Sequence, residues 1–230
     1  MNAPLFYHPN VNESSIQLDE ETSKHIHVLR MQKGQELFLT DGQGRTAKAV
    51  IADDNRKKTF VEVQSIKNEA PKSRKVSIAI SLVKNSSRFE WFLEKATEIG
   101  VSEIIPFLCE RTEKEKFRHD RMQTILISAM LQSQQTWLPV LHQPTSFEKI
   151  ISDSSHDQRF IAHCLPGEKQ HLSSVGAHRS SIILIGPEGD FTSREIEHAM
   201  SQTFAPVALG STRLRTETAG IVAAALLVNA

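Results

Sequence analysis

The stretch 209-LGSTRLRTETAGIVAAALL-227 places a short polar loop between an apolar run and a helix rich in small residues. Gly210 ends the apolar run, and Arg215–Thr218 brings a cation, an anion and two hydroxyls together just before the helix. Thr216 or Thr218 is the expected N-cap. Because a helix start offers free N–H groups and positive dipole charge, the stretch indicates either a ligand-binding loop or an ordinary capped C-terminal helix.

A second stretch of the same design, 181-SIILIGPEGDFTSRE-195, favours the ligand-binding interpretation. Ile182–Ile185 is continuously apolar and predicts a strand buried on both faces. Gly186–Gly189 ends that strand with turn residues. Thr192 and Glu195 have the spacing of a capping box, so a helix is expected to open near Ser193.

Both stretches therefore predict a buried strand, a polar loop containing glycine and a helix. Open α/β sheets bind their ligands in such loops, at the carboxyl ends of the strands. Neither loop carries GxGxxG or GxxxxGK[ST]. Dinucleotide binding and P-loop phosphate binding are disfavoured for this reason.

These motifs, IGPEG before a helix and LG-x-x-x-LRTET-A, resemble those of the RsmE family of bacterial 16S ribosomal RNA (uracil-N3) methyltransferases, in the SPOUT superfamily. The resemblance extends to His25–Met31, to Glu94–Val101 and to the pair Glu110-Arg111. It implies an α/β fold: a SPOUT-type, trefoil-knotted methyltransferase domain with an N-terminal PUA-like β-barrel domain. It also implies S-adenosylmethionine as cofactor, 16S rRNA or the small ribosomal subunit as partner, and a homodimer.

Composition adds limits to this interpretation. The 230 residues are 39% hydrophobic and include 27 basic and 27 acidic side chains, so any RNA site must come from local clustering of charge. No apolar run approaches the roughly 18 residues of a membrane span, and the expected location is cytoplasmic, with no membrane partner. Cys109 and Cys164 are expected to be buried free thiols, and no metal site is expected.

Residues 1–70 are expected to form the PUA-like, RNA-binding β-barrel. Strand patterns cover Leu37–Thr40, Thr46–Ile51 and Thr59–Ile66, with turn signals between them. Asp19–Met31 interrupts them with a helix pattern. A small β-barrel with one helix satisfies this order of elements.

The polar segment Asn68–Arg74 marks the boundary to the second domain, residues 73–230. Val76–Val83 predicts a strand, a helix pattern follows up to a C-terminal cap at Gly100, and Ile104–Leu108 predicts the next strand. This β-α-β order favours a mostly parallel sheet. A long helix from Met122 to about Gln135 and a strand at Phe160–Ala162 are also expected.

The resemblance assigns the site residues. Arg215 would donate to a uracil carbonyl oxygen as negative charge develops there, and Glu217 would either accept the N3 proton or hold the cofactor's amino group. The expected cofactor-binding residues are Ile185, Gly186, Pro187, Glu188, Gly189, Leu209, Gly210, Leu214, Arg215, Thr216, Glu217, Thr218 and Ala219. His163 is added to them because it lies at the carboxyl end of a predicted strand, where sheets bind their ligands.

RNA phosphate contacts are expected from basic residues in both domains, namely Arg30, Arg45, Arg111, Lys114 and Arg121. For the charged segment Glu110–Arg121, a solvated loop is the competing interpretation, because its charges are of both signs. Two other functions stay open from sequence. One is a SPOUT methyltransferase acting on another RNA, such as a ribose hydroxyl of transfer RNA, and the other is an RNA-binding assembly factor without catalysis.

Overall fold

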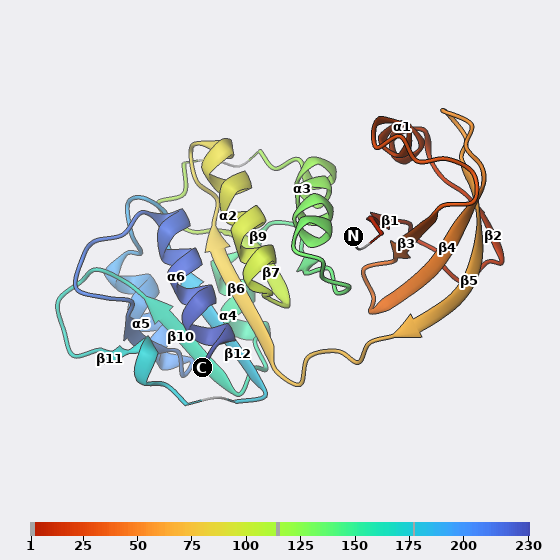
Figure 1. The fold of residues 1–230 in the computed structure, drawn as a ribbon. Coiled ribbons are helices and arrows are strands. Elements are labelled where there is room, and N and C mark those ends of the chain that lie inside the picture. Colours follow the sequence, from red (N-terminus) through yellow and green to blue (C-terminus); the bar gives the residue numbers. More distant parts are fainter. Residues whose placement is uncertain (1–2, 114–115, 177) are drawn as a thin grey trace. The chain divides into compact units, whose positions relative to one another are not determined.

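The structure is a computed structural model that describes residues 3–113, 116–176 and 178–230 (Figure 1). It contains two compact units. The first comprises Met1–Pro71 together with Met130–Leu138, and the second comprises Lys72–Ala129 together with Pro139–Ala230. Each unit is described by itself below.

The first unit is built on a five-stranded sheet with strand order β1-β3-β4-β5-β2. β1 and β3 are parallel, and the other neighbours are antiparallel. Alternate side chains of β4 are buried, as in a strand with one face toward the core. The elements are β1 (Leu5–Tyr7), β2 (Ser15–Gln17), α1 (Glu20–Val28), β3 (Glu36–Thr40), β4 (Arg45–Asp53) and β5 (Phe60–Asn68).

Helix α1 is shorter than the predicted Asp19–Met31, because both ends are capped inside that range. The side chain of Asp19 accepts a hydrogen bond from the Thr22 N–H at 2.7 Å. At the other end Arg30 adopts a left-handed conformation, with φ of 58°, and the Met31 N–H donates to the carbonyl of Ile26 at 3.1 Å. This arrangement ends a helix and turns the chain sharply.

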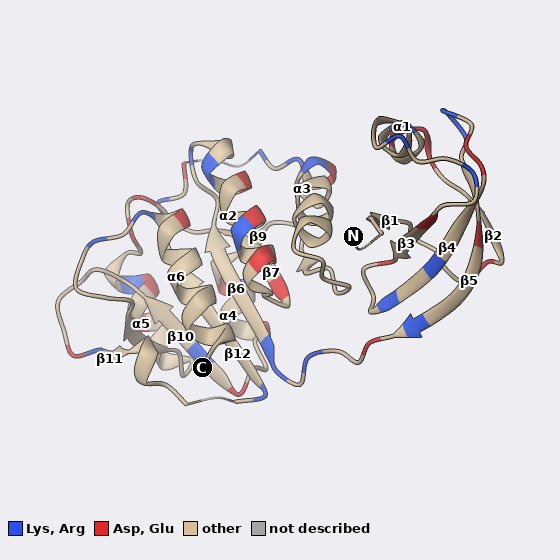
Figure 2. Ribbon diagram, in the orientation of Figure 1, with Lys and Arg blue, Asp and Glu red and all other residues tan. Residues whose placement is uncertain are grey.

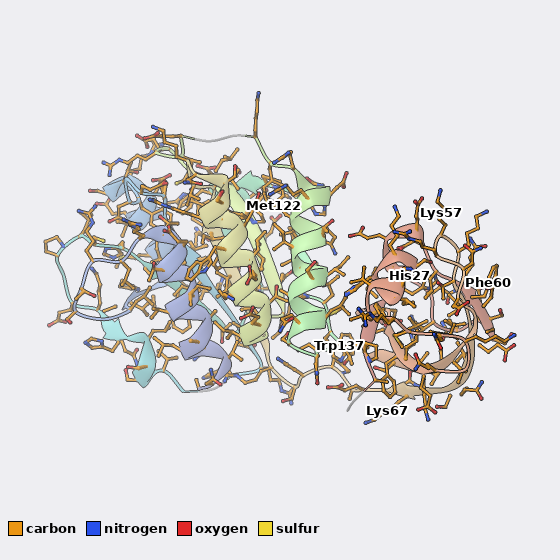
Figure 3. The ribbon with its side chains drawn as sticks, turned by 45° about the horizontal axis from the view of Figure 1, so that its top comes forward. His27, Lys57, Phe60, Lys67, Met122 and Trp137 are labelled. Carbon is orange, nitrogen blue, oxygen red and sulfur yellow. The ribbon has the colours of Figure 1, made fainter. Side chains whose placement is uncertain are left out.

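The segment Met130–Leu138 joins the first unit through the β3–β4 turn. The Gly44 N–H donates to the Thr136 carbonyl at 2.9 Å, and the Leu138 N–H donates to the Gly42 carbonyl at 2.8 Å. Trp137, labelled in Figure 3, packs so closely on Gly44 that a Cβ there would lie 2.4 Å from the indole ring. Only glycine fits at this position.

The second unit is built on a parallel sheet of eight strands, with order β11-β13-β10-β12-β6-β7-β8 and with β9 paired to β7. This confirms the predicted parallel sheet. Its first half contains β6 (Lys75–Ser81), α2 (Ser86–Ile99), β7 (Glu103–Leu108), α3 (His119–Gln132, of which the last three residues belong to the first unit), β8 (Val140–Leu141), β9 (Thr145–Ser146) and α4 (Phe147–Asp153). Its second half contains β10 (Gln158–Ala162), β11 (Gln170–His171), the 3-10 turn η1 (Leu172–Ser174), β12 (Ser180–Ile185), α5 (Ser193–Ser201), β13 (Ala205–Ala208) and α6 (Thr216–Val228).

Local sequence signals explain the ends of several elements. The capping box of α5 is present, with the Thr192 and Glu195 side chains bonded to each other's backbone N–H groups. Gly100 ends α2 in a left-handed conformation, with φ of 93°, as predicted. The predicted N-cap of α6 is wrong, because Thr216 is already inside the first turn and Arg215 is the N-cap. The side chain of Arg215 makes no capping bond.

Helix α6 packs beside α2, and a glycine allows their close approach (Figure 1). A Cβ on Gly220 would lie 2.6 Å from the ring of Phe92 and 3.0 Å from the Cδ1 of Ile80. Figure 2 shows that α6 carries charge only in its first turn, at Glu217. Such a helix is apolar on its outer face as well as on its inner face.

Candidate functional site

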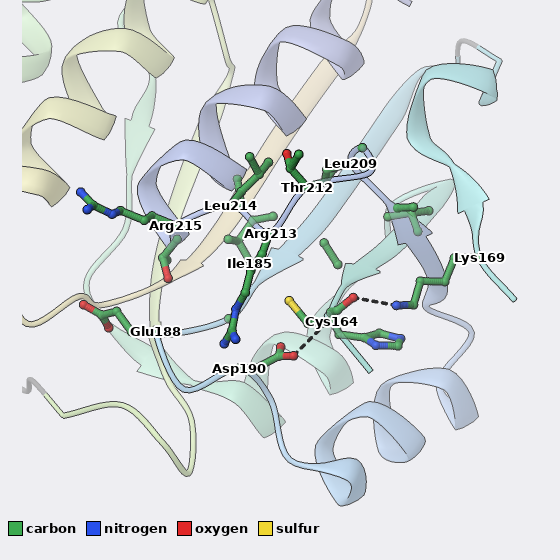
Figure 4. A pocket seen from close by; sticks show the side chains of 18 of the residues that line it. Cys164, Lys169, Ile185, Glu188, Asp190, Leu209, Thr212, Arg213, Leu214 and Arg215 are labelled. Carbon is green, nitrogen blue, oxygen red and sulfur yellow. Dashed lines mark hydrogen bonds between the residues drawn. The ribbon is translucent and has the colours of Figure 1, made fainter. Parts of the chain in front are cut away.

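A cavity of about 700 Å³ opens at the carboxyl ends of β10, β12 and β13 (Figure 4). Because these strands are parallel, the loops that follow them meet at one edge of the sheet. The lining residues are Ala162, His163, Cys164, Lys169, Ile185, Gly186, Pro187, Glu188, Asp190, Val207, Ala208, Leu209, Gly210, Ser211, Thr212, Arg213, Leu214, Arg215, Thr216 and Ala219. The two motif loops that the sequence singled out therefore line the same cavity.

The lining includes all but three of the expected cofactor-binding residues. Gly189, Glu217 and Thr218 are the exceptions. The lining also contains polar residues that were not expected from sequence, among them Lys169, Asp190 and Arg213. Asp190 and Arg213 stand inside the two motif stretches, so their position was a usable signal, whereas Lys169 belongs to a loop without any recognised motif.

Asp190 connects the loop after β12 to the end of β10. Its carboxylate accepts hydrogen bonds from the N–H groups of Cys164 and Phe191, both at 2.8 Å. The bond to Cys164 is drawn in Figure 4. Close packing also fixes this loop, since a Cβ on Gly186 would lie 3.1 Å from the ring of Phe191. Glycine thus lets the loop fold back tightly beneath the cavity.

His163 lines the cavity, and its ring carries a buried polar atom without a partner in the described part of the chain. Among the described residues no hydrogen-bond partner reaches its buried Nδ1. Burial lowers the pKa of His163, and the charge of Lys169 lowers it further, while Asp190 acts in the opposite direction. The imidazole is therefore neutral at pH 7. Lys169 fixes this loop by donating from Nζ to the carbonyls of His163 at 2.8 Å and Leu165 at 2.6 Å.

Two arginines line the cavity without ionic partners. Within the described residues, the side chain of neither Arg213 nor Arg215 forms an ion pair or a hydrogen bond. Their side chains take different directions in Figure 4: that of Arg213 points toward Asp190, and that of Arg215 extends away from it. Both cations are thus free to meet an anion or a polar oxygen.

Glu217 lies outside the cavity lining and is buried in the first turn of α6. Its Oε1 lies 3.7 Å from the Nε of Arg88 on α2. This ion pair joins the two helices beside the cavity. Arg88 was not expected at the site from sequence, because the two partners belong to distant parts of the chain.

The basic residues expected to contact RNA differ in how far their side chains are engaged. Arg30 is exposed. The Arg45 guanidinium pairs with buried Asp41, and the Arg121 guanidinium makes two bonds to Glu90 at 2.6 and 2.8 Å. Nη1 of Arg111 donates to the Gly189 carbonyl at 2.8 Å, and Lys114 lies outside the described residues. A role in RNA binding stays a prediction for all of them.

Three further observations limit the chemistry. Cys109 is half-buried and Cys164 is exposed, so the expectation of two buried thiols is wrong for Cys164, which lies at the cavity instead of in the core. In the described ranges no group of three or more histidine, cysteine or acidic residues could hold a metal ion. No helix within the described part of the chain has the length and apolar character needed to span a membrane.

Comparison with known proteins assigns the family. The RNA methyltransferase domain matches residues 68–228, and the RNA methyltransferase PUA domain matches residues 18–64. The ribosomal RNA small subunit methyltransferase E of Synechocystis is 32% identical, over 89% of this chain and 70% of its own length. The chain belongs to this methyltransferase family. The family and the α/β fold with a PUA-like N-terminal domain, both predicted from sequence, are confirmed.

Solved structures agree with this assignment. A probable rRNA methyltransferase from Porphyromonas gingivalis is 40% identical, with a TM-score of 0.91 over 96% of this chain and 95% of that chain. A methyltransferase from Legionella pneumophila, solved with bound S-adenosylmethionine, is 26% identical, with a TM-score of 0.88 over 98% of this chain and 97% of that chain. The trefoil knot stays a prediction from the resemblance.

Proposed function

We propose that this protein transfers a methyl group from S-adenosylmethionine to N3 of a specific uridine in 16S ribosomal RNA. The observation that carries the proposal is the cavity that the two motif loops line together. Relatives of this chain are named as methyltransferases of the small ribosomal subunit RNA, and the Legionella neighbour holds the cofactor. The reaction takes place in the cytoplasm, where the RNA is.

The residues of the cavity fit the cofactor. Its volume of about 700 Å³ lies within the roughly 300–1,000 Å³ of small-molecule sites. Ile185, Leu209 and Leu214 offer apolar surface to an adenine ring, and the loop backbone offers N–H and carbonyl groups. The unfilled Nδ1 of His163 is a polar atom that a ribose hydroxyl or a base edge would satisfy.

The protein's part in the reaction is positioning and charge control. S-adenosylmethionine supplies a methyl group that is already activated. Uracil N3–H, with a pKa roughly two units above neutral, costs about 3 kcal/mol to ionise at pH 7, with the proton passing to solvent water. Arg215, which has no ionic partner in the described residues, lowers that cost by donating to a uracil carbonyl oxygen. Because N3 is on the Watson–Crick edge, the uridine must be unpaired when it reacts.

Glu217 supports this chemistry through the start of α6. Its 3.7 Å ion pair with Arg88 and its position outside the cavity lining support a role in holding the helix turn that carries Arg215. Both roles named from sequence, proton acceptor and ligand of the cofactor's amino group, require the carboxylate to turn toward the cavity. We therefore favour the arrangement in which Glu217 acts through Arg215.

Residues 1–70 serve as the RNA-binding domain in this proposal, and residues 73–230 carry out methyl transfer. Arg30 is exposed at the end of α1 and follows two exposed apolar residues, Val28 and Leu29. This combination suits RNA, since phosphate attracts the cation and unstacked bases pack on apolar side chains. Replacing a cation that binds phosphate would make RNA binding weaker and less dependent on salt.

A homodimer forms through α6 in this proposal. The inner face of the helix is buried, yet its outer face is also apolar and includes half-exposed Val222. Exposed Trp91 stands on the neighbouring helix α2. Charge introduced by Val222→Asp is expected to give monomers in sedimentation, whereas the wild type should sediment as a dimer. A wild-type monomer at micromolar concentration would contradict the dimer.

The proposed reaction is tested by transfer of labelled methyl groups from S-adenosylmethionine to ribosomal particles from cells that lack this protein. Nucleoside analysis of the RNA should then show N3-methyluridine. A ribose-methylated nucleoside, or labelling of transfer RNA alone, would instead establish the first rival function. Cofactor-independent RNA binding without methyl transfer would establish the assembly factor.

A further inference from the structure

The turn after β7 lies directly against the loop that follows β12. The Glu110 N–H donates to Oε1 of Glu195 at 2.9 Å, and Nη1 of Arg111 donates to the Gly189 carbonyl at 2.8 Å. Glu195 belongs to the capping box that opens α5. Glu110 and Arg111, the second and third residues after β7, therefore hold the loop at its middle and at its end.

Arg111 contacts the loop at Gly189, which is not among the residues that line the cofactor cavity, although Glu188 and Asp190 on either side of it are. A Cβ on Gly189 would lie 3.4 Å from both Cβ and Cδ of Arg111, so the aliphatic part of the arginine covers this glycine. Arg111 thus holds the loop from a position outside the cavity lining.

The turn that carries Arg111 is itself anchored to the sheet. Oγ1 of Thr112 accepts from the Cys109 N–H at 2.9 Å and lies 2.8 Å from Oγ of Ser81, at the end of β6. Such a turn holds the backbone of Arg111 in place. An exposed basic residue that contacts only solvent or RNA would not need its backbone to be anchored.

The loop that follows β6 also bonds to the loop that follows β12. The Lys84 N–H donates to Oε1 of Glu188 at 3.1 Å, and Nζ of Lys84 pairs with Glu113 at 3.0 Å. Glu188 is a lining residue of the cavity. The loops after β6 and β7 therefore both bond to the loop after β12, at two consecutive residues.

We propose that Arg111 is a positioning residue that holds Gly186–Asp190 in the conformation that binds S-adenosylmethionine. This assignment rests on the proposed function and differs from the RNA contact that the sequence suggested for Arg111. Loss of the guanidinium frees the Gly189 carbonyl and uncovers its backbone, and the loop then samples conformations that do not bind. The fraction of binding-competent protein falls, and the apparent affinity falls with it.

The experiment compares Arg111→Ala, Arg111→Lys and wild type. Calorimetry measures the affinity for S-adenosylhomocysteine without RNA, and filter binding measures RNA affinity at several salt concentrations. Arg111→Ala should weaken cofactor-analogue binding about tenfold, the size of one hydrogen bond to a charged group, and should raise the KM for the cofactor with little change in kcat. Arg111→Lys should restore part of this affinity, because an ammonium can still donate to the carbonyl.

Arg118→Ala is the matched control, since Arg118 is an exposed arginine on the same charged segment and, as far as the described residues go, makes no bond to the cofactor loop. It should leave affinity for the analogue unchanged. Unchanged affinity in Arg111→Ala, combined with a salt dependence of RNA binding that falls by about one phosphate contact, would overturn the proposal. If wild type binds the analogue but does not methylate ribosomal RNA, the proposed function fails, and the analogue affinities still decide the role of Arg111.

Discussion

The parallel strands of the eight-stranded sheet begin at one side, here called the amino edge, and end at the other, the carboxyl edge. The two edges differ in whether their polar side chains have partners. At the carboxyl edge, within the described residues, Arg213 and Arg215 have no ionic partner and Nδ1 of His163 has no hydrogen bond. At the amino edge, Glu103 at the start of β7 is surrounded by donors. Polar groups without partners at the carboxyl edge indicate a ligand site. Polar groups that bond to one another at the amino edge indicate a structural cluster.

The distances at the amino edge show how completely Glu103 is satisfied. Its carboxylate accepts from Oγ of Ser77 at 2.6 Å and pairs with Nζ of Lys75 at 2.9 Å and with Nε2 of His142 at 2.5 Å. Burial acts to raise the pKa of Glu103, but His156, Ser77 and Lys75 together outweigh it and hold the pKa well below its usual range. The cluster stabilises the fold as long as Glu103 is ionised.

The largest expected effect is on catalysis, from Arg215→Ala at the carboxyl edge. Loss of one donor to a developing negative charge should lower the methyl-transfer rate by roughly 10²–10³-fold with little change in unfolding free energy. Single-turnover transfer to ribosomal particles measures this rate. Lys75→Ala, which removes a cation at the amino edge, should leave the rate unchanged. Full activity in Arg215→Ala would remove Arg215 from the mechanism.

The second effect is on stability, from Glu103→Gln at the amino edge. It removes the negative charge and replaces one acceptor oxygen by an NH2 group that cannot accept from the surrounding donors, so the free energy of unfolding should fall by about 1–3 kcal/mol in urea titration. The methyl-transfer rate at a temperature where the variant is folded should not change. Loss of activity without loss of stability would give this cluster a functional role and would break the comparison.

The lowered pKa of Glu103 makes the difference in unfolding free energy between wild type and Glu103→Gln depend on pH. A carboxyl group with a lower pKa in the folded state than in the unfolded state stabilises the protein fully above its unfolded pKa, about 4.3. The stabilisation is lost as the pH falls from there toward the folded pKa. The difference in unfolding free energy between wild type and Glu103→Gln should therefore be smaller at pH 3 than at pH 5.

A smaller effect is expected on cofactor affinity, from His163→Ala. If Nδ1 gains its missing hydrogen bond from the cofactor, the affinity for S-adenosylhomocysteine should fall by between about twofold and tenfold. Because burial lowers the pKa of His163, its charge does not change between pH 7 and pH 8, and wild-type affinity should be flat over that range. His142→Ala, at the amino edge, should lower stability and leave this affinity unchanged. Equal affinities for wild type and His163→Ala would contradict the contact.

The sequence predicted what depends on neighbouring residues. The apolar run Ile182–Ile185, the capping box at Thr192 and the left-handed Gly100 each follow from a few adjacent side chains, and the structure has all three. The resemblance supplied the rest of the fold and most of the cavity lining. Very short strands such as β1 and β9 carry too few residues to give a periodic signal, so they were missed.

Contacts between distant residues could not be predicted. Arg111 and Gly189 lie 78 residues apart, and only the parallel sheet brings the loops that hold them together. The same is true of the ion pair of Arg88 with Glu217. A basic residue in the sequence looks the same whether it will contact phosphate or a carbonyl of its own chain, which is why Arg111 was expected to meet RNA.

The smallest expected effect is on stability, and it compares backbone strain at the two edges. Asp190, at the cavity, and Thr203, before β13 at the amino edge, both adopt left-handed conformations, with φ of 62° and 67°. That conformation is unfavourable for a β-branched residue, so Thr203→Gly should raise stability by about 0.5–1 kcal/mol, or the melting temperature by about 2–4 °C, without changing cofactor affinity. Asp190→Gly relieves similar strain but removes the carboxylate that binds the Cys164 N–H, so it should weaken cofactor binding. Lower stability in Thr203→Gly would mean that the hydrogen bond from the Thr203 hydroxyl to the Gln202 carbonyl, at 2.6 Å, outweighs the backbone strain at Thr203.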